Sequence, residues 1–162
     1  MELKTLYREI VNEHNLHPEH KRNLENPTMV LEGVNPSCGD DINLQLEIRD
    51  GVITDAAFNG NGCAISQASA DMMIDLIMGK PLEEAMRLQK SFMGMIQGTA
   101  SEEEIEELEE AAALQDISHM PSRVKCAVLG WHTMTEMLPP DIVCLVFSRY
   151  RQHLCHKPPY RV

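Results

Sequence analysis

The sequence predicts an α+β protein in which a small three-stranded antiparallel sheet packs against several helices. Residues Ile42 to Ile48 alternate apolar and polar side chains, which is the two-residue period of a strand with one buried face. Asp50-Gly51 then provides a tight turn, and Val52 to Phe58 returns as the partner strand of a hairpin. After Gly62 the apolar residues recur at spacings of three and four, which indicates helices.

Length and charge narrow the classes of function. At 162 residues the chain is long enough for one domain with its own core, and its net charge is −11. Such acidity argues against nucleic acid and anionic membranes as partners. No apolar run is long enough to cross a membrane, and the charged N-terminus does not resemble a signal peptide, so we expect a cytoplasmic protein. The five cysteines favour free thiols and metal or redox chemistry over disulfides.

The N-terminal segment predicts one helix followed by a loop. Apolar residues recur at helical spacing over residues 2–13. The polar stretch after them carries His14, His17 and His20 at intervals of three. Because Pro18 interrupts any continuous helical face through these histidines, a solvated loop is favoured over a metal site.

Further elements follow in order along the chain. Thr28 to Val34 is the third strand of the predicted sheet. Apolar spacing predicts four more helices, over residues 64–78, 82–96, 101–114 and 121–138. The third of these begins with the capping box Ser101 and Glu104, and its glutamates favour a solvated face. The eleven methionines lie within apolar stripes, which favours core filling over a soft-metal site.

The composition changes at Pro139-Pro140. Residues 1–138 carry a formal charge of −14, whereas residues 139–162 carry +3. We therefore expect a folded domain over residues 1–138 and an atypical basic tail over residues 139–162, with disorder as one alternative. The run 142–147 fits either a strand or a short helix. Possible metal ligands also occur in the tail, without any spacing that fixes their geometry: Cys144, His153, Cys155 and His156.

Four side chains suited to one metal ion occur in three short segments: Cys38, Asp40, Cys63 and Cys126. Three sulfurs and one oxygen form a four-coordinate set that zinc accepts. Pro36 and Gly39 allow Cys38 and Asp40 to converge at a turn. Cys63 and Cys126 are predicted at helix N-termini, Cys126 in the first turn, where the helix dipole favours a thiolate. Spacing alone is weak evidence because no C-x-x-C pair is present, but we expect the fold to gather all four near the surface.

The sequences around these residues resemble the IscU/NifU-like family of iron–sulfur cluster assembly proteins. The resemblance runs from residue 1 to about residue 137 and is carried by three segments: Asn35-Pro36-Ser37-Cys38-Gly39-Asp40, Gly60-Asn61-Gly62-Cys63-Ala64-Ile65-Ser66 and Arg123-Val124-Lys125-Cys126-Ala127. The resemblance is strongest to the SufU branch of the family. Lys125 stands where scaffold-type relatives have a histidine, and the acidic segment 100–118 resembles that branch's insertion. The implied fold is SufE/IscU-like. The basic tail departs from the family pattern.

The resemblance implies a zinc-dependent sulfurtransferase. Zn²⁺ would be held by Cys38, Asp40, Cys63 and Cys126, since a protonated Lys125 is a poor ligand. Cys38 would be the catalytic thiol, accepting persulfide sulfur from a SufS-type, PLP-dependent cysteine desulfurase and relaying it to downstream Suf scaffold proteins. A histidine of the desulfurase would replace Cys38 on the metal and free its thiolate. Two alternatives stay open: a scaffold for an iron–sulfur cluster on the same cysteines, and a structural zinc domain without chemistry.

Overall fold

The structure, a computed structural model of the 162-residue chain, describes residues 2–138. The tail over residues 139–162, with its possible strand and its possible metal ligands, lies outside the described residues. The elements in chain order are α1 (Leu3–Leu16), β1 (Met29–Asn35), β2 (Asp40–Arg49), β3 (Val52–Asn61), α2 (Ala64–Ile77), α3 (Leu82–Gln97), α4 (Glu102–Glu106), the 3₁₀ helix η1 (Glu109–His119) and α5 (Pro121–Met137). Over the described part of the chain, no helix has both the length and the apolar character to cross a membrane.

The predicted three-stranded antiparallel sheet is confirmed, in the order β1-β2-β3. In the central strand β2, Leu44 pairs with Leu31 of β1 and with Phe58 of β3. The alternating apolar side chains of β2 lie on one face, as their two-residue period requires: Ile42, Leu44 and Leu46 are fully buried and Ile48 is partly buried. Asp50 and Gly51 both have positive φ, of 51° and 74°, which matches the tight turn expected from the Asp-Gly pair.

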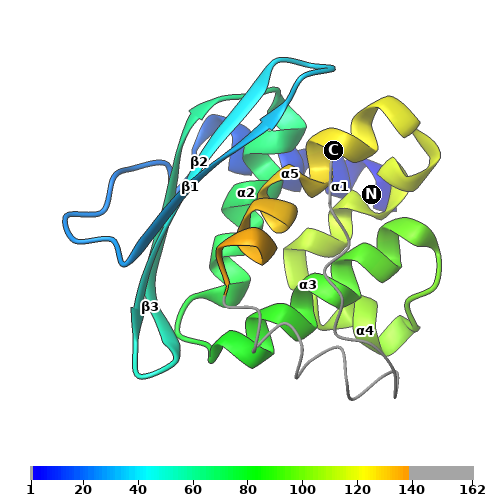
Figure 1. Ribbon diagram of the computed structural model, residues 1–162. Coiled ribbons are helices and arrows are strands. Elements are labelled where there is room, and N and C mark those ends of the chain that lie inside the picture. Colours follow the sequence, from blue (N-terminus) through cyan, green and yellow to red (C-terminus); the bar gives the residue numbers. More distant parts are fainter. Residues whose placement is uncertain (1, 139–162) are drawn as a thin grey trace.

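Helices cover one face of this sheet. Figure 1 shows α2 and α5 beside the sheet, with α1, α3 and α4 farther from it. Strand β1 approaches α5 closely at Gly33, where an added Cβ would lie 1.9 Å from the Thr133 hydroxyl oxygen. This approach brings the turn that follows β1 next to the N-terminal half of α5.

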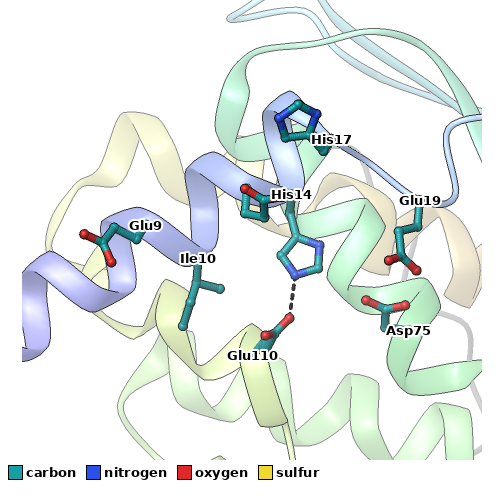
Figure 2. A pocket seen from close by; sticks show the side chains of 8 residues that line it. Glu9, Ile10, His14, His17, Glu19, Asp75 and Glu110 are labelled. Atoms are coloured by element: carbon teal, nitrogen blue, oxygen red, sulfur yellow. Dashed lines mark hydrogen bonds and ion pairs between the residues drawn. The ribbon is translucent and has the colours of Figure 1, made fainter.

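The prediction of a solvated loop at the histidines is wrong for two of the three. Helix α1 continues to Leu16, so His14 belongs to its last turn, and only His17 is exposed. The His14 and His20 side chains are just 11% and 10% exposed because they contact carboxylates of later helices. Figure 2 shows His14 facing Glu110 of η1. Contacts with residues this distant in sequence leave no signal in the local sequence. The spacing of the histidines and Pro18 therefore favoured a solvated loop.

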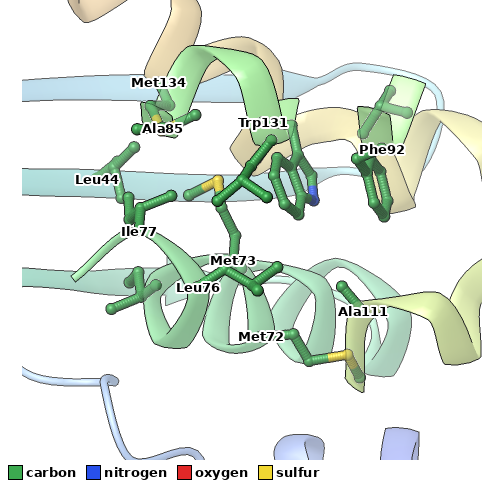
Figure 3. Close-up of a cluster of buried hydrophobic side chains, with 14 of the residues drawn as sticks. Leu44, Met72, Met73, Leu76, Ile77, Ala85, Phe92, Ala111, Trp131 and Met134 are labelled. Atoms are coloured by element: carbon green, nitrogen blue, oxygen red, sulfur yellow. The ribbon is translucent and has the colours of Figure 1, made fainter. Parts of the chain in front are cut away.

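The core lies between the sheet and the helices, and methionines help to fill it. Trp131 stacks on Phe92 with ring centroids 4.3 Å apart and an interplanar angle of 8° (Figure 3). The Trp131 indole N–H donates to the Ser69 hydroxyl at 3.1 Å, which satisfies the polar atom of this buried ring. Met72 and Met73 are completely or almost completely buried, in agreement with core filling.

The acidic segment is not the single α-helix predicted over residues 101–114. The capping box of Ser101 and Glu104 is present, but α4 ends at Glu106, and Glu109 has a positive φ of 51°. Glutamates at spacings of three and four repel one another along an α-helix. Ala113 of η1 is buried, and four further buried apolar residues recur with a period of three, which matches a 3₁₀ helix: Leu108, Ala111, Leu114 and Ile117.

Candidate metal centre

Cys38 lies in the short turn that joins β1 to β2. Asn35 ends β1 and pairs with Asp40, the first residue of β2. The Asn35 carbonyl oxygen accepts hydrogen bonds from the backbone N–H groups of Cys38 at 3.3 Å and Gly39 at 2.9 Å. Gly39 has a φ of +70°, which glycine adopts without strain. The turn leaves Cys38 exposed and Asp40 only 2% exposed.

Cys63 caps the N-terminus of α2, as the sequence predicted. Its sulfur accepts a hydrogen bond from the backbone N–H of Ser66 at 3.4 Å. Its own backbone N–H donates to Asp40 Oδ1 at 2.8 Å, and its Sγ lies 3.8 Å from Asp40 Oδ2. One carboxylate therefore connects the start of β2 to the start of α2.

Cys126 is the deepest of the three thiols. It is the sixth residue of α5 and lies in the second turn, so its prediction in the first turn is wrong. The dipole effect is strongest in the first turn, and burial dominates at this position instead. Burial raises the pKa of the Cys126 thiol, and hydrogen bonds with Asp40, Cys38 and Cys63 raise it further.

The fold brings the four predicted side chains together. Cys38 Sγ, a carboxylate oxygen of Asp40 and Cys126 Sγ all lie within 4.8 Å of one another. Cys63 adjoins this cluster through its contacts with Asp40 and Cys126. The donor set of three sulfurs and one oxygen fits a tetrahedral zinc ion. A cation there would also favour deprotonation of the buried Cys126 thiol, whose neutral form the protein alone stabilises.

Asn35 supports the centre in a way that sequence reasoning missed. Its side chain is completely buried, and its Nδ2 lies 3.8 Å from Cys126 Sγ, to which it donates. Its Oδ1 accepts a hydrogen bond from the Ser37 backbone N–H at 3.2 Å. An asparagine before a proline at a turn already suggests the second contact. The contact with Cys126 joins positions 91 residues apart, and no feature of the local sequence indicates it.

Comparison with protein families and with curated relatives gives consistent results. Residues 6–137 match the family model described as the NifU-like N terminal domain. The chain is 41% identical over 132 residues to the zinc-dependent sulfurtransferase SufU of Bacillus subtilis, covering 82% of this chain and 88% of that protein. It is 38% identical over 138 residues to the iron–sulfur cluster assembly scaffold protein IscU of Thermotoga maritima, covering 85% and 96%.

A solved structure supports the same relationship. The crystal structure of a candidate iron–sulfur cluster assembly scaffold protein for the SUF system from Fervidobacterium islandicum superposes with a TM-score of 0.76 at 34% identity. The match covers 83% of this chain and 98% of that one. The three-stranded sheet with its covering helices is thus an architecture shared with solved relatives.

Proposed function

The chain belongs to the NifU-like N-terminal domain family, whose relatives serve iron–sulfur cluster assembly, and from this membership we propose that it is a zinc-dependent sulfurtransferase. It would accept sulfur on Cys38 from the persulfide of a SufS-type cysteine desulfurase. One observation carries the choice of residue. Among the three cysteines that the structure describes, Cys38 is exposed, Cys63 is partly buried and Cys126 is buried, so Cys38 is the thiol that a partner protein reaches.

The transfer needs no external oxidant or reductant. The Cys38 thiolate would attack the outer sulfur of the donor's persulfide, forming a new S–S bond at Cys38. The S–S bond of the donor breaks at the same time, and the donor cysteine leaves as a thiolate. The sulfur now bound to Cys38 would pass to Suf scaffold proteins in the cytoplasm.

The other three residues would hold the metal. Zn²⁺, when bound, keeps its thiolate ligands deprotonated at neutral pH and adds binding energy to the folded state. Asp40, Cys63 and Cys126 lie at the starts of β2 and α2 and in α5, where regular structure holds them. Cys38 lies in the turn, so it would be the ligand that is free to leave the metal and react with the partner's persulfide.

The second candidate is a scaffold on which an iron–sulfur cluster is assembled. The 38% identity to the Thermotoga maritima scaffold favours it, because the same cysteines would serve as cluster ligands. Metal content separates the two functions. A colourless protein with about one zinc per chain supports sulfur transfer, whereas a brown protein with visible absorption supports the scaffold.

The decisive test is stimulation of a cysteine desulfurase. The purified chain is added to a SufS-type desulfurase with cysteine as substrate, and alanine formation is compared for the wild type and Cys38→Ala. We expect stimulation by the wild type alone, with mass spectrometry detecting one extra sulfur atom on Cys38. Equal stimulation by Cys38→Ala would overturn the proposal and favour a structural zinc domain that binds its partner without accepting sulfur.

A further inference from the structure

A second cluster of possible metal ligands lies between α1, α2 and η1. His14 contacts Asp71 of α2 through Nδ1 at 2.7 Å and Glu110 of η1 through Nε2 at 2.6 Å. His20, in the connection after α1, contacts Asp75 of α2 through Nε2 at 2.5 Å. Figure 2 shows His14, Glu19, Asp75 and Glu110 around one pocket.

The donor atoms form two overlapping groups. One group contains His14, Asp71 and Asp75, and the other contains Glu19, His20 and Asp75. Within each group one donor atom from every residue lies within 4.8 Å of the others. Asp75 belongs to both groups, but the 4.8 Å limit is met within each group and not across the two, so a single ion takes its donors from one group.

This cluster is separate from the thiol centre. Cys63 stands directly before α2, and Asp75 follows it by twelve residues along the same helix. That separation is roughly 18 Å at 1.5 Å per residue. Metal binding at the two places can therefore be measured independently.

The contacts of His14 require a positive charge. A neutral imidazole has one N–H donor and one unprotonated nitrogen, and a carboxylate oxygen facing that second nitrogen would repel it. Both nitrogens of His14 face carboxylate oxygens at hydrogen-bond distance, so a proton or a metal ion must lie on the second one.

The cluster contains more carboxylates than imidazoles. Two imidazolium ions would offset two of its four carboxylates, of which only Asp71 is completely buried: Glu19, Asp71, Asp75 and Glu110. Asp71 is completely buried, where uncompensated charge is costly, although it accepts backbone N–H bonds from His20 at 2.9 Å and Glu19 at 3.4 Å. Two neighbouring basic side chains contact residues outside the cluster, since Lys21 donates to Gln67 and Arg22 donates to Asp55.

We propose that this cluster is a second metal site, which binds one divalent first-row transition-metal ion such as Fe²⁺, Zn²⁺ or Mn²⁺. Its ligands are His14, Asp71 and Asp75, the group that contains the completely buried carboxylate. Imidazole and carboxylate donors suit these ions, and the absence of sulfur among them distinguishes the site from the thiol centre. The ion fastens α1 to α2.

Cobalt titration of the full-length chain tests this site. Co²⁺ bound by thiolates gives intense charge-transfer absorption in the near ultraviolet, whereas Co²⁺ bound by imidazole and carboxylate gives only weak d–d bands. The metal-free wild-type protein is titrated anaerobically, and bound Co²⁺ is counted by equilibrium dialysis. We expect about one further ion per chain to bind without adding charge-transfer absorption.

Variants assign that ion to the cluster. The double variant His14→Gln/His20→Asn should lose the sulfur-free ion and keep the charge-transfer absorption of the thiolates. His17→Asn is the matched control, because His17 belongs to the same segment but is exposed and outside both groups, and it should bind as the wild type does. Should the double variant fail to fold, as judged by circular dichroism, Asp75→Asn replaces it, since this side chain is 39% exposed.

The outcomes separate the two metal proposals. If all Co²⁺ binding ends when the charge-transfer absorption saturates, or if the variants retain the sulfur-free ion, the second site does not exist and the cluster is a network of ion pairs. If the sulfur-free ion binds while charge-transfer absorption is absent, the second site holds and the thiol centre fails. Thiolates elsewhere in the chain would add to the charge-transfer absorption, so they cannot mimic the proposed ion.

Discussion

The Sγ atoms of Cys126 and Cys38 lie 3.4 Å apart, although the residues are separated by 88 positions. Cys126 is held inside α5 and is completely buried, whereas Cys38 stands exposed on the turn between β1 and β2. The structure thus places a buried thiol, held in a helix, in contact with an exposed thiol that a partner protein can reach. We expect Cys126 to retain the metal and Cys38 to react with the partner.

Replacing each of these cysteines should separate metal retention from sulfur transfer. Cys126→Ala should lose zinc and should lower the unfolding temperature, because it removes a buried ligand. Cys38→Ala should abolish stimulation of the desulfurase while losing less stability, because its side chain is exposed. Zinc content by elemental analysis and thermal unfolding by circular dichroism measure the difference. Equal loss of stability in both variants would contradict this division.

Asp40 should be needed for zinc retention beyond its hydrogen bond to Cys63. Asp40→Asn can still accept the Cys63 N–H through its amide oxygen but lacks the charge of a zinc ligand. We expect Asp40→Asn to fold and to lose zinc to a chelator faster than the wild type. Asp41→Asn, at the neighbouring position of β2, is the control and should retain zinc. Wild-type retention in Asp40→Asn would remove Asp40 from the ligand set.

Asn35 should stabilise both the turn and the Cys126 sulfur. Asn35→Ala removes the donor to Cys126 and the acceptor for the Ser37 N–H, and it leaves a cavity at a buried position. We expect a loss of about 1–3 kcal/mol in the free energy of unfolding by urea. Asn61→Ala, at the exposed end of β3, should cost about 0.5 kcal/mol or less. Similar values for the two variants would contradict the supporting role.

The elements that were predicted best are those in which the spacing of apolar residues itself indicates the buried face. The alternation in β2 and the apolar spacing of α2 and α3 gave each element within a few residues of its observed ends. The four predicted ligands could be grouped because their local segments resemble those of a known family, not because of their spacing. The first-turn position predicted for Cys126 was wrong although the helix start at Pro121 was correct, because Cys126 is the sixth residue of α5 and one turn takes 3.6 residues.

The failures of prediction occur where distant contacts override local patterns. His14 and His20 owe their burial to Asp71 and Asp75, which lie more than 50 positions away. The acidic segment contains both a capping box and apolar residues, which favoured a continuous helix. Most of the buried residues after Leu108 recur with a period of three, a pattern that differs little from α-helical spacing over so short a run.

Gly33 should control how closely β1 approaches α5. Gly33→Ala would place a methyl group 1.9 Å from the Thr133 hydroxyl oxygen, so one element must shift. We expect a loss of about 1–3 kcal/mol in the free energy of unfolding, with weaker zinc retention as the two thiols move apart. Adding Thr133→Ala should restore much of the loss. Gly94→Ala is the control, since its nearest neighbour would lie at 3.4 Å and stability should hold or rise.

His132 should make the protein less stable in mild acid. Burial lowers the pKa of His132 below 6.5 and outweighs the attraction of Glu136, which raises it. The unfolded chain therefore binds a proton at this position more readily than the folded one, and stability falls as the pH drops below about 6.5. Replacing the imidazole with a side chain that does not titrate, in His132→Gln, should reduce that fall. Urea unfolding of both proteins between neutral pH and mild acid measures the slopes, and identical slopes would show that His132 contributes nothing to them.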